Sequence, residues 1–301
     1  MRALIIGIDG TIGRALGDAL AADGATVYGT TRREASAAAG DRRIRLDLAA
    51  PNAADVPLPE VDVAVFCAAM ARFADCREQP ELTYRVNVAT PLPLARRIVA
   101  AGARIVLLST SAVFDGSLPH RREDDVACPT TAYGRLKAEA EAGFLGLGAA
   151  AAVLRLTKIV TPDMPLLAGW VAALSARCPV EAFADLRFCP LVLEDAVDAL
   201  LAVIREGTGG VWHVSGSNDI SYAEAARHLA KSHGADLRLV RQTRACEHGI
   251  PADEILTHTS LDTARLTALT GFRPPTPETV LDATFPPPLA AGHRLAASAV
   301  G

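Results

Sequence analysis

The sequence predicts an α/β protein: a doubly wound parallel sheet with helices on both faces, joined to a smaller α/β lobe from the C-terminal half. Two observations predict this class. Short apolar runs alternate with helical patterns through the first half of the chain, which is the order that βαβ units produce. The 301 residues are 50% hydrophobic but only 5% aromatic, and such a composition suits closely packed strands and helices.

The strands and helices of the first half follow from two patterns. Strands buried on both faces of a parallel sheet are continuous apolar runs, and such runs occupy residues 3–8, 25–29, 44–46, 61–66, 104–108 and 151–156. Apolar residues at helical spacing predict helices over residues 12–22, from near 80 to 101, and 131–147. Repeated units of this length require a parallel sheet.

The second half is less regular. We expect helices at 169–177 and 194–205, a strand at 191–193 that returns to the sheet, and another strand at 210–214. Ser221 followed by Glu224 predicts a capping box at a helix start, and a second box is expected from Ser260 or Asp262. Residues 1–160, completed by about 190–215, form the predicted sheet domain. Residues 161–189 and 216–285 form the predicted lobe, and residues 286–301 are expected to be poorly ordered.

Charge and cysteine content exclude several classes of function. The net charge of −4 provides no positive field for nucleic acid or an anionic membrane. No apolar stretch approaches the length of a membrane helix or resembles a signal peptide, so a cytoplasmic location is expected. The six cysteines form no C-x-x-C pair and lie at no zinc-ligand spacing from histidine, so we expect isolated reduced thiols and no metal.

A glycine-rich turn joins the first strand to the first helix. Gly7, Gly10 and Gly13 follow the pattern G-x-x-G-x-x-G, with Thr11 and Ile12 at the helix start. Such glycines let the backbone approach a pyrophosphate, and the amides of the helix N-terminus then face its charge. A plain tight turn is the alternative, but the strand before it and the helix after it favour a Rossmann dinucleotide site.

The end of the second strand predicts which dinucleotide is bound. An acidic residue there would bind the ribose 2′-hydroxyl of NAD, whereas this chain has Arg32 and Arg33. Two guanidinium groups suit a 2′-phosphate, so NADP(H) is the expected cofactor and NAD(H) is less favoured. The alternative is a solvated basic start to the next helix.

Two further segments follow strands at the same edge of the sheet. Asp47, next to Leu48, would accept a hydrogen bond from an adenine amino group or would simply form a turn. Ala68 and Ala69, after Cys67, supply small side chains either beside a dinucleotide or for packing alone.

A candidate reaction centre lies between the fifth strand and the following helix. Tyr133 and Lys137 are four residues apart, so they share one helix face, and the ammonium would lower the pKa of the phenol. Hydride transfer to a carbonyl needs such a proton donor. Thr110, between Ser109 and Ser111, ends the fifth strand where parallel sheets bind ligands, although a hydroxyl there could also cap a loop.

Together these motifs resemble the extended short-chain dehydrogenase/reductases of the NAD-dependent epimerase/dehydratase superfamily. The stretch from Ser109 to Gly116 is most similar to the dTDP-4-dehydrorhamnose reductase branch. The resemblance implies that Tyr133 is the proton donor, that Lys137 also binds the nicotinamide ribose, that Thr110 binds the carbonyl oxygen and that Asn87 lies near the cofactor. It also implies a homodimer bundle in which the 130–147 helix joins the 80–101 helix.

Ser111 and Ala112 depart from the family patterns. The rhamnose-pathway reductases carry Asp-Tyr at these positions, and the dehydratases carry Asp-Glu, so the particular sugar is open and 4,6-dehydration is disfavoured. The resulting expectation is an NADP(H)-dependent reduction of a keto group on a nucleotide-linked sugar or similar polar small molecule. An epimerase with tightly bound NAD, or a non-catalytic NADP-binding regulatory subunit, are the alternatives.

Overall fold

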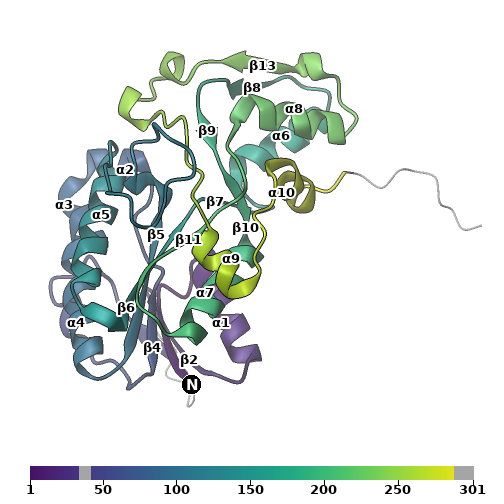
Figure 1. Cartoon of the computed structure of the whole chain (residues 1–301). Helices are drawn as coiled ribbons and strands as arrows, with labels where there is room; N and C mark the ends of the chain where they lie inside the picture. Colours follow the sequence, from purple (N-terminus) through teal and green to yellow (C-terminus); the bar gives the residue numbers. More distant parts are fainter. Residues whose placement is uncertain (34–41, 288–301) are drawn as a thin grey trace, which may run out of the picture.

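The computed structural model describes residues 1–33 and 42–287, and a seven-stranded parallel sheet lies at its centre (Figure 1). The strand order is β11-β6-β5-β4-β1-β2-β3. Its strands are β1 (Arg2–Ile6), β2 (Thr26–Thr31), β3 (Arg43–Arg45), β4 (Val63–Phe66), β5 (Arg104–Thr110), β6 (Ala151–Leu156) and β11 (Gly210–Val214). The order reverses between β1 and β4, and this reversal opens a crevice at the carboxyl ends of the strands.

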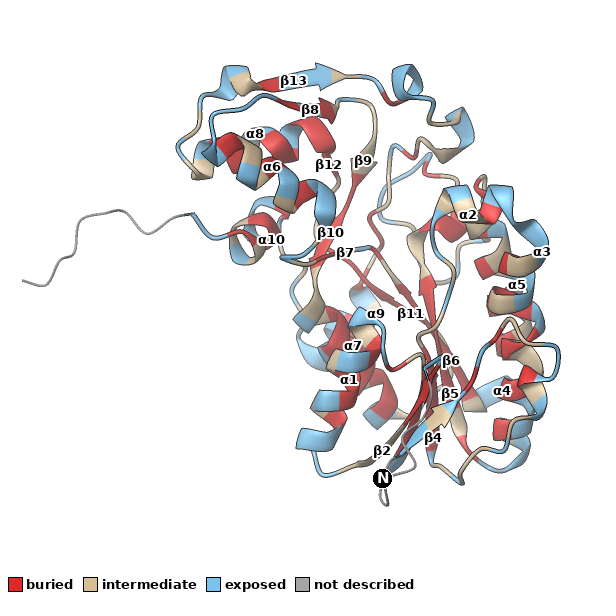
Figure 2. Cartoon of the chain, turned by 180° about the vertical axis from the view of Figure 1, so that it is seen from behind, coloured by how far each residue is buried: buried red, intermediate tan, exposed pale blue. Residues whose placement is uncertain are grey.

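Helices cover both faces of the sheet, as the doubly wound fold requires (Figure 2). One face carries α1 (Thr11–Ala22), α7 (Leu193–Glu206) and α9 (Ala264–Thr270). The other carries α2 (Phe73–Glu78), α3 (Pro80–Tyr84), α4 (Pro91–Ala100) and α5 (Ala132–Leu145). Two separate apolar cores result, one against α1 and α7 and one against α4 and α5. Strand residues such as Ile5 and Leu4 alternate between these cores.

A second layer of structure lies beyond the carboxyl ends of the strands (Figure 1). It contains α6 (Pro165–Ser175), α8 (Tyr222–Ser232) and α10 (Pro277–Thr284). Three pairs of short strands belong to this half of the chain: β7 (Lys158–Val160) with β10 (Pro190–Val192), β9 (Arg187–Phe188) with β12 (Ile220–Ser221), and β8 (Val180–Phe183) with β13 (Val240–Thr243). A third apolar core holds this layer together around Trp170, Leu229 and Val280.

Two expectations for the second half are wrong. The strand near 191–193 does not return to the central sheet, because β11 occupies the position beside β6 and β10 pairs with β7 instead. No capping box starts at Ser260 or Asp262: Thr263 is the N-cap of α9, while Asp262 accepts a hydrogen bond from the Ala264 amide at 2.7 Å. The capping box of Ser221 and Glu224 is confirmed.

The helix expected from near 80 to 101 is interrupted by a π-helical turn over Arg85–Ala89. There the Thr90 amide donates to the carbonyl of Arg85, five residues earlier, at 3.0 Å. Pro91 has no amide hydrogen and cannot continue the α-helical pattern, so a new helix begins at that residue.

Part of the predicted C-terminal tail, residues 288–301, lies outside the described residues, as do residues 34–41. Within the described ranges, no helix combines the length and apolarity needed to cross a bilayer. The six cysteines are all free thiols, as expected.

Candidate active site

The glycine turn is built by close backbone approaches that no side chain would allow. Gly7 has a φ of +92°, and a Cβ atom there would lie 2.7 Å from the Cβ of Ala68. A Cβ on Gly13 would lie 2.3 Å from the Gly7 carbonyl oxygen. Gly10 is the N-cap residue of α1 and makes no such collision. The N-terminus of α1, beginning at Thr11, therefore faces the β1–β4 crevice with its amides free of side-chain caps, which fits a dinucleotide pyrophosphate.

The end of β2 is tied to this turn by hydroxyl groups. The Gly7 amide donates to Thr30 Oγ1 at 2.9 Å, and Thr31 Oγ1 donates to Asp9 Oδ2 at 2.5 Å. Arg32 and Arg33 follow directly and are both exposed. The structure thus places residues 32 and 33 directly after β2, whose end is bonded to the glycine turn.

The remaining predicted cofactor residues have structural roles that the geometry shows directly. Asp47 accepts a hydrogen bond from the Ala49 amide at 3.0 Å, so it is a turn former, and its adenine contact stays a prediction. Leu48 is buried in the core. The Asn87 side chain is also buried, and it both accepts from the Met70 amide and donates to the Met70 carbonyl, each at 2.9 Å.

Asn87 therefore fixes the loop after β4, which contains Ala68 and Ala69. Ala68 packs against Gly7, so this loop forms one wall of the glycine turn. We expect Asn87 to influence a bound dinucleotide through the position of this loop rather than by direct contact.

The start of α5 is held tightly against the end of β5. Thr131 is the N-cap, and its hydroxyl accepts a hydrogen bond from the Gly134 amide at 2.9 Å. A Cβ on Gly134 would lie 2.0 Å from the carbonyl oxygen of Ala112, so only glycine allows this approach. The contact places Tyr133, in the first turn of α5, next to the Thr110–Ala112 segment.

Burial sets the protonation of the two predicted catalytic groups. The Tyr133 phenol has a raised pKa, mainly because burial penalises the phenolate. The Lys137 side chain is only 3% exposed, burial lowers its pKa to about 8, and the carboxylate of Glu141 partly opposes this lowering. Its Nζ donates to the Leu108 carbonyl oxygen at 2.6 Å. Burial therefore dominates the pKa of Tyr133, which lies above rather than below its ordinary value, and the role of Tyr133 as proton donor stays a prediction.

Thr110 serves two purposes at the end of β5. Its hydroxyl oxygen accepts a hydrogen bond from the Ala112 amide at 3.1 Å, which caps the short helical turn over Ser111–Val113. The hydroxyl hydrogen is not consumed by this bond, because a threonine hydroxyl both donates and accepts. Thr110 lines the cavity described below and can donate to an oxygen placed there.

One helical turn beyond Lys137, a buried ionic network crosses three strands. Glu141 accepts hydrogen bonds from Ser109 on β5 and from Arg155 on β6, the latter at 2.7 Å. Arg155 also contacts His213 on β11 at 3.3 Å. These four side chains are all buried, so the ion pair is desolvated and its breakage would be costly. The network ties α5, the helix that carries Tyr133 and Lys137, to strands β5, β6 and β11.

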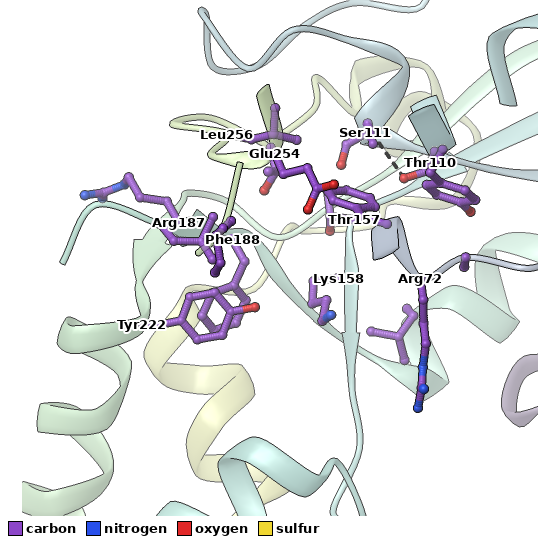
Figure 3. Close-up of a pocket in the computed structure, with 18 of the residues that line it drawn as sticks. Arg72, Thr110, Ser111, Thr157, Lys158, Arg187, Phe188, Tyr222, Glu254 and Leu256 are labelled. Atoms are coloured by element: carbon purple, nitrogen blue, oxygen red, sulfur yellow. Dashed lines mark hydrogen bonds between the residues drawn. The ribbon is translucent and has the colours of Figure 1, made fainter. Parts of the chain in front are cut away.

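A cavity of about 630 Å³ lies between the carboxyl edge of the sheet and the second layer of structure (Figure 3). One end of the cavity is lined by Thr110, Ser111 and Tyr133. The other end is lined by Phe188 and Tyr222, whose ring centroids are 4.5 Å apart. Charged groups also line it: Arg72, Lys158, Arg187 and Glu254. The cavity thus has a reactive end and an aromatic end.

Comparison with known proteins agrees with this geometry. The family model described as the RmlD substrate binding domain matches residues 1–286. The chain belongs to the RmlD family. The relatives of this chain include the dTDP-4-dehydrorhamnose reductase of Mycobacterium tuberculosis, which is 30% identical over 239 residues, covering 76% of this chain and 77% of that protein. The resemblance drawn from the sequence motifs is confirmed.

Two further comparisons, one of sequence and one of structure, also find proteins similar to this chain. Methionine adenosyltransferase 2 subunit beta of Xenopus tropicalis is 29% identical over 186 residues, covering 56% of this chain and 53% of that protein. The structure of dTDP-4-dehydrorhamnose reductase from Bacillus anthracis, solved in complex with NADP, superposes with a TM-score of 0.79 at 19% identity, over 94% of this chain and 98% of that one. The predicted Rossmann-type fold is confirmed.

Sequence reasoning missed most of the cavity wall and the buried network. Arg187 on β9 lines the cavity, donates to the Asp219 carbonyl at 3.0 Å and pairs with Glu224 at 3.6 Å. A signal for the network was present, because Arg155 interrupts an otherwise apolar strand and a buried charge requires a partner. The wall residues 250–259 carry no comparable signal.

Proposed function

We propose that this protein reduces a keto group on a nucleotide-linked sugar, using NADPH and a proton from Tyr133. The observation that carries the proposal is that Thr110 and Tyr133 line one cavity, with Lys137 one helical turn from Tyr133. The RmlD family, the name of the mycobacterial reductase and the NADP complex of the Bacillus anthracis protein support it. Arg32 and Arg33 would bind the 2′-phosphate.

The chain's own groups fit each requirement of the reaction. When bound, NADPH supplies the hydride. The Thr110 hydroxyl donates a hydrogen bond to the carbonyl oxygen and orients the carbonyl. Tyr133 then gives its proton to the developing alkoxide and recovers a proton from solvent, so the products are an alcohol and the oxidised dinucleotide. The positive charge of Lys137 stabilises the phenolate formed in this step.

The second layer of structure would select the substrate. We propose that residues 161–189 and 216–285 form the substrate-binding lobe, because the cavity wall opposite Thr110 comes from Leu186–Phe188, Tyr222 and the 250–259 segment. The aromatic end of the cavity would receive the nucleotide, and the sugar would reach the reactive end.

A reduction assay with a matched variant tests the proposal. Purified protein is incubated with NADPH and a panel of nucleotide 4-keto sugars while nicotinamide absorbance is followed. Tyr133→Phe should keep NADPH binding and lose about a hundredfold to ten-thousandfold in kcat, the usual contribution of a general acid. Tyr84→Phe is the control, because Tyr84 is exposed, lies outside the cavity lining and donates its hydroxyl hydrogen to Glu139. Normal turnover by Tyr133→Phe would refute the role of Tyr133.

A second candidate function has one observation in its favour. The Xenopus tropicalis relative is named as a subunit of methionine adenosyltransferase, so a non-catalytic NADP-binding subunit is the alternative. NADPH binding without oxidation of NADPH on any sugar would support it. Isomerised sugar without net NADPH consumption would instead support an epimerase.

A further inference from the structure

Lys158 lies in the middle of the cavity, between its reactive and aromatic ends. It is the first residue of β7, two positions after Leu156, which is the register partner of Thr110 on the neighbouring strand. Figure 3 draws its side chain between the Tyr222 and Phe188 rings on one side and Arg72 on the other. Thr157 and Ile159, its neighbours in the chain, line the same cavity.

The ammonium of Lys158 has no partner within the described residues. Its backbone amide donates to the Cys189 carbonyl at 3.0 Å, and its side chain forms neither a hydrogen bond nor an ion pair there. The Lys158 residue is exposed, so its ammonium is accessible from the cavity, although the surrounding wall lowers the pKa of that ammonium by desolvation. An accessible ammonium that no protein carboxylate neutralises is available to form a charge-assisted hydrogen bond with an anionic group of a ligand.

Of the three other charged groups of the cavity wall, two are already paired, and the third, Arg72, is a cation with no side-chain hydrogen bond or ion pair among the described residues. Glu254, the carboxylate of the wall, pairs with Arg77 outside the cavity. Arg187 pairs with Glu224. Lys158, together with Arg72, therefore leaves an excess of positive charge in the cavity, where the sugar and diphosphate of a nucleotide sugar would lie.

We propose, on the basis of the proposed function, that Lys158 is a specificity-determining residue that binds an anionic oxygen group of the nucleotide-sugar substrate. Two parts of such a ligand carry that chemistry. One is a carboxylate on the sugar ring, as in a hexuronate, and the other is the diphosphate that every nucleotide sugar carries. A sugar bearing hydroxyl groups alone would meet Lys158 only through its diphosphate.

Binding of two nucleotide sugars that differ at one carbon distinguishes these sources. UDP-glucuronic acid carries a carboxylate where UDP-glucose carries a hydroxymethyl group. Dissociation constants are measured for both ligands, and for UDP, with the wild-type protein and with Lys158→Met in the presence of NADP⁺. Loss of a charge-assisted hydrogen bond should weaken binding by about tenfold to a hundredfold.

Each result has a defined meaning. If the sugar carboxylate is the partner, Lys158→Met weakens UDP-glucuronic acid alone. If the diphosphate is the partner, it weakens all three ligands by a similar factor. Unchanged dissociation constants for all three would overturn the proposal. If the wild-type protein binds none of them, the inference about Lys158 fails, while the proposed function is judged separately by the reduction assay with nucleotide 4-keto sugars.

The chain offers matched controls. Lys231, another of its three lysines, is exposed near the end of α8 and lies outside the cavity, so Lys231→Met should leave every dissociation constant unchanged. Lys158→Arg keeps the positive charge and should retain most of the affinity. Thermal unfolding of each variant checks folding, and little change is expected for Lys158→Met because the ammonium makes no protein contact to lose.

Discussion

At the scale of single residues, burial decides the protonation states on the first two turns of α5. The phenol of Tyr133 holds its proton because burial raises its pKa, and this protonated state suits the proposed role of proton donor. Burial lowers the pKa of Lys137 to about 8, so the charge of its side chain can change at mildly alkaline pH. A protonated phenol and a charged lysine both suit the reduction of a keto group. Proton donation by a buried phenol is helped by a neighbouring charge that stabilises the phenolate left behind.

This arrangement predicts a pH dependence of kcat/KM. Lys137 is charged below its pKa and neutral above it, so the rate of keto reduction should fall as the pH rises through about 8. Lys137→Arg keeps its charge at higher pH and should remove that fall. Two groups face the ammonium, Glu141 on α5 and Cys67 after β4, and both raise its pKa.

Glu141→Gln should accordingly move the fall in rate to lower pH, since it removes a carboxylate that favours the charged lysine. Kinetics between pH 6 and 9.5 measure the shift, with circular dichroism to confirm folding of the variant. A flat profile for the wild-type protein, or a shift to higher pH in Glu141→Gln, would contradict this assignment.

Arg32 and Arg33 predict cofactor preference at the same scale. Replacing both with alanine should raise the dissociation constant of NADPH by about tenfold to a hundredfold, because two charge-assisted contacts with a 2′-phosphate are lost. Binding of NADH, which has no 2′-phosphate, should change little. Fluorescence titration with both nucleotides measures the ratio of the NADPH and NADH dissociation constants. Arg227→Ala, on the exposed surface of α8, is the control. Equal effects on both nucleotides would show that these arginines do not read the 2′-phosphate.

At the scale of elements, substitutions in the glycine turn distinguish a dinucleotide-binding loop from a plain tight turn. Gly10 has a φ of −72°, and a Cβ there would meet only the Gly7 carbonyl oxygen at 3.4 Å, an ordinary contact. Gly10→Ala should therefore keep the unfolding temperature nearly unchanged while the added methyl group weakens NADPH binding by about tenfold or more.

Gly13→Ala should instead destabilise the fold, because its Cβ would lie 2.3 Å from the Gly7 carbonyl oxygen. Gly169→Ala, an open position in α6, is the control that should affect neither property adversely. Thermal unfolding and NADPH titration measure both effects. A drop in unfolding temperature for Gly10→Ala, without a specific loss of NADPH affinity, would favour the plain turn.

The elements that sequence could predict are those with a repeated physical pattern. Strands such as β1 and β6 are buried on both faces, so they are apolar runs, and α5 begins at a threonine cap. The short pairs β9 with β12 and β8 with β13 have two to four residues per strand and no such pattern. Their pairing is set by the third core, which forms only when the chain is folded.

At the scale of the whole molecule, the candidate site divides into two parts of different predictability. Thr110, Tyr133 and Lys137 belong to compact motifs, so sequence alone brought them together. The opposite wall comes from segments far apart in the chain, and residues such as Lys158 and Glu254 reach it only through the packing of the second layer against the sheet edge. Local pattern contains no information about such contacts.

Two polar contacts link the sheet domain to the 245–254 segment, which forms part of the cavity wall. Arg77 on α2 pairs with Glu254, and Thr130, just before α5, donates to the Asp253 carbonyl at 2.9 Å. Both bonds join the sheet domain to the 245–254 segment. Because Arg77 is partly exposed, the ion pair should contribute only about 0–1 kcal/mol to the free energy of unfolding. Its main effect should be on the position of the cavity wall.

Arg77→Ala should therefore raise the KM for the sugar substrate several-fold, with kcat and the KM for NADPH nearly unchanged. Release of Glu254 adds to this effect, because its carboxylate becomes free to pair with a cavity cation that would otherwise meet the substrate. Arg238→Ala, which breaks an exposed pair with Asp236 in the same half of the chain, is the control and should change neither constant. Steady-state kinetics with each substrate varied in turn measure the effect. If the KM for NADPH rises instead, the ion pair supports the cofactor crevice and not the substrate wall.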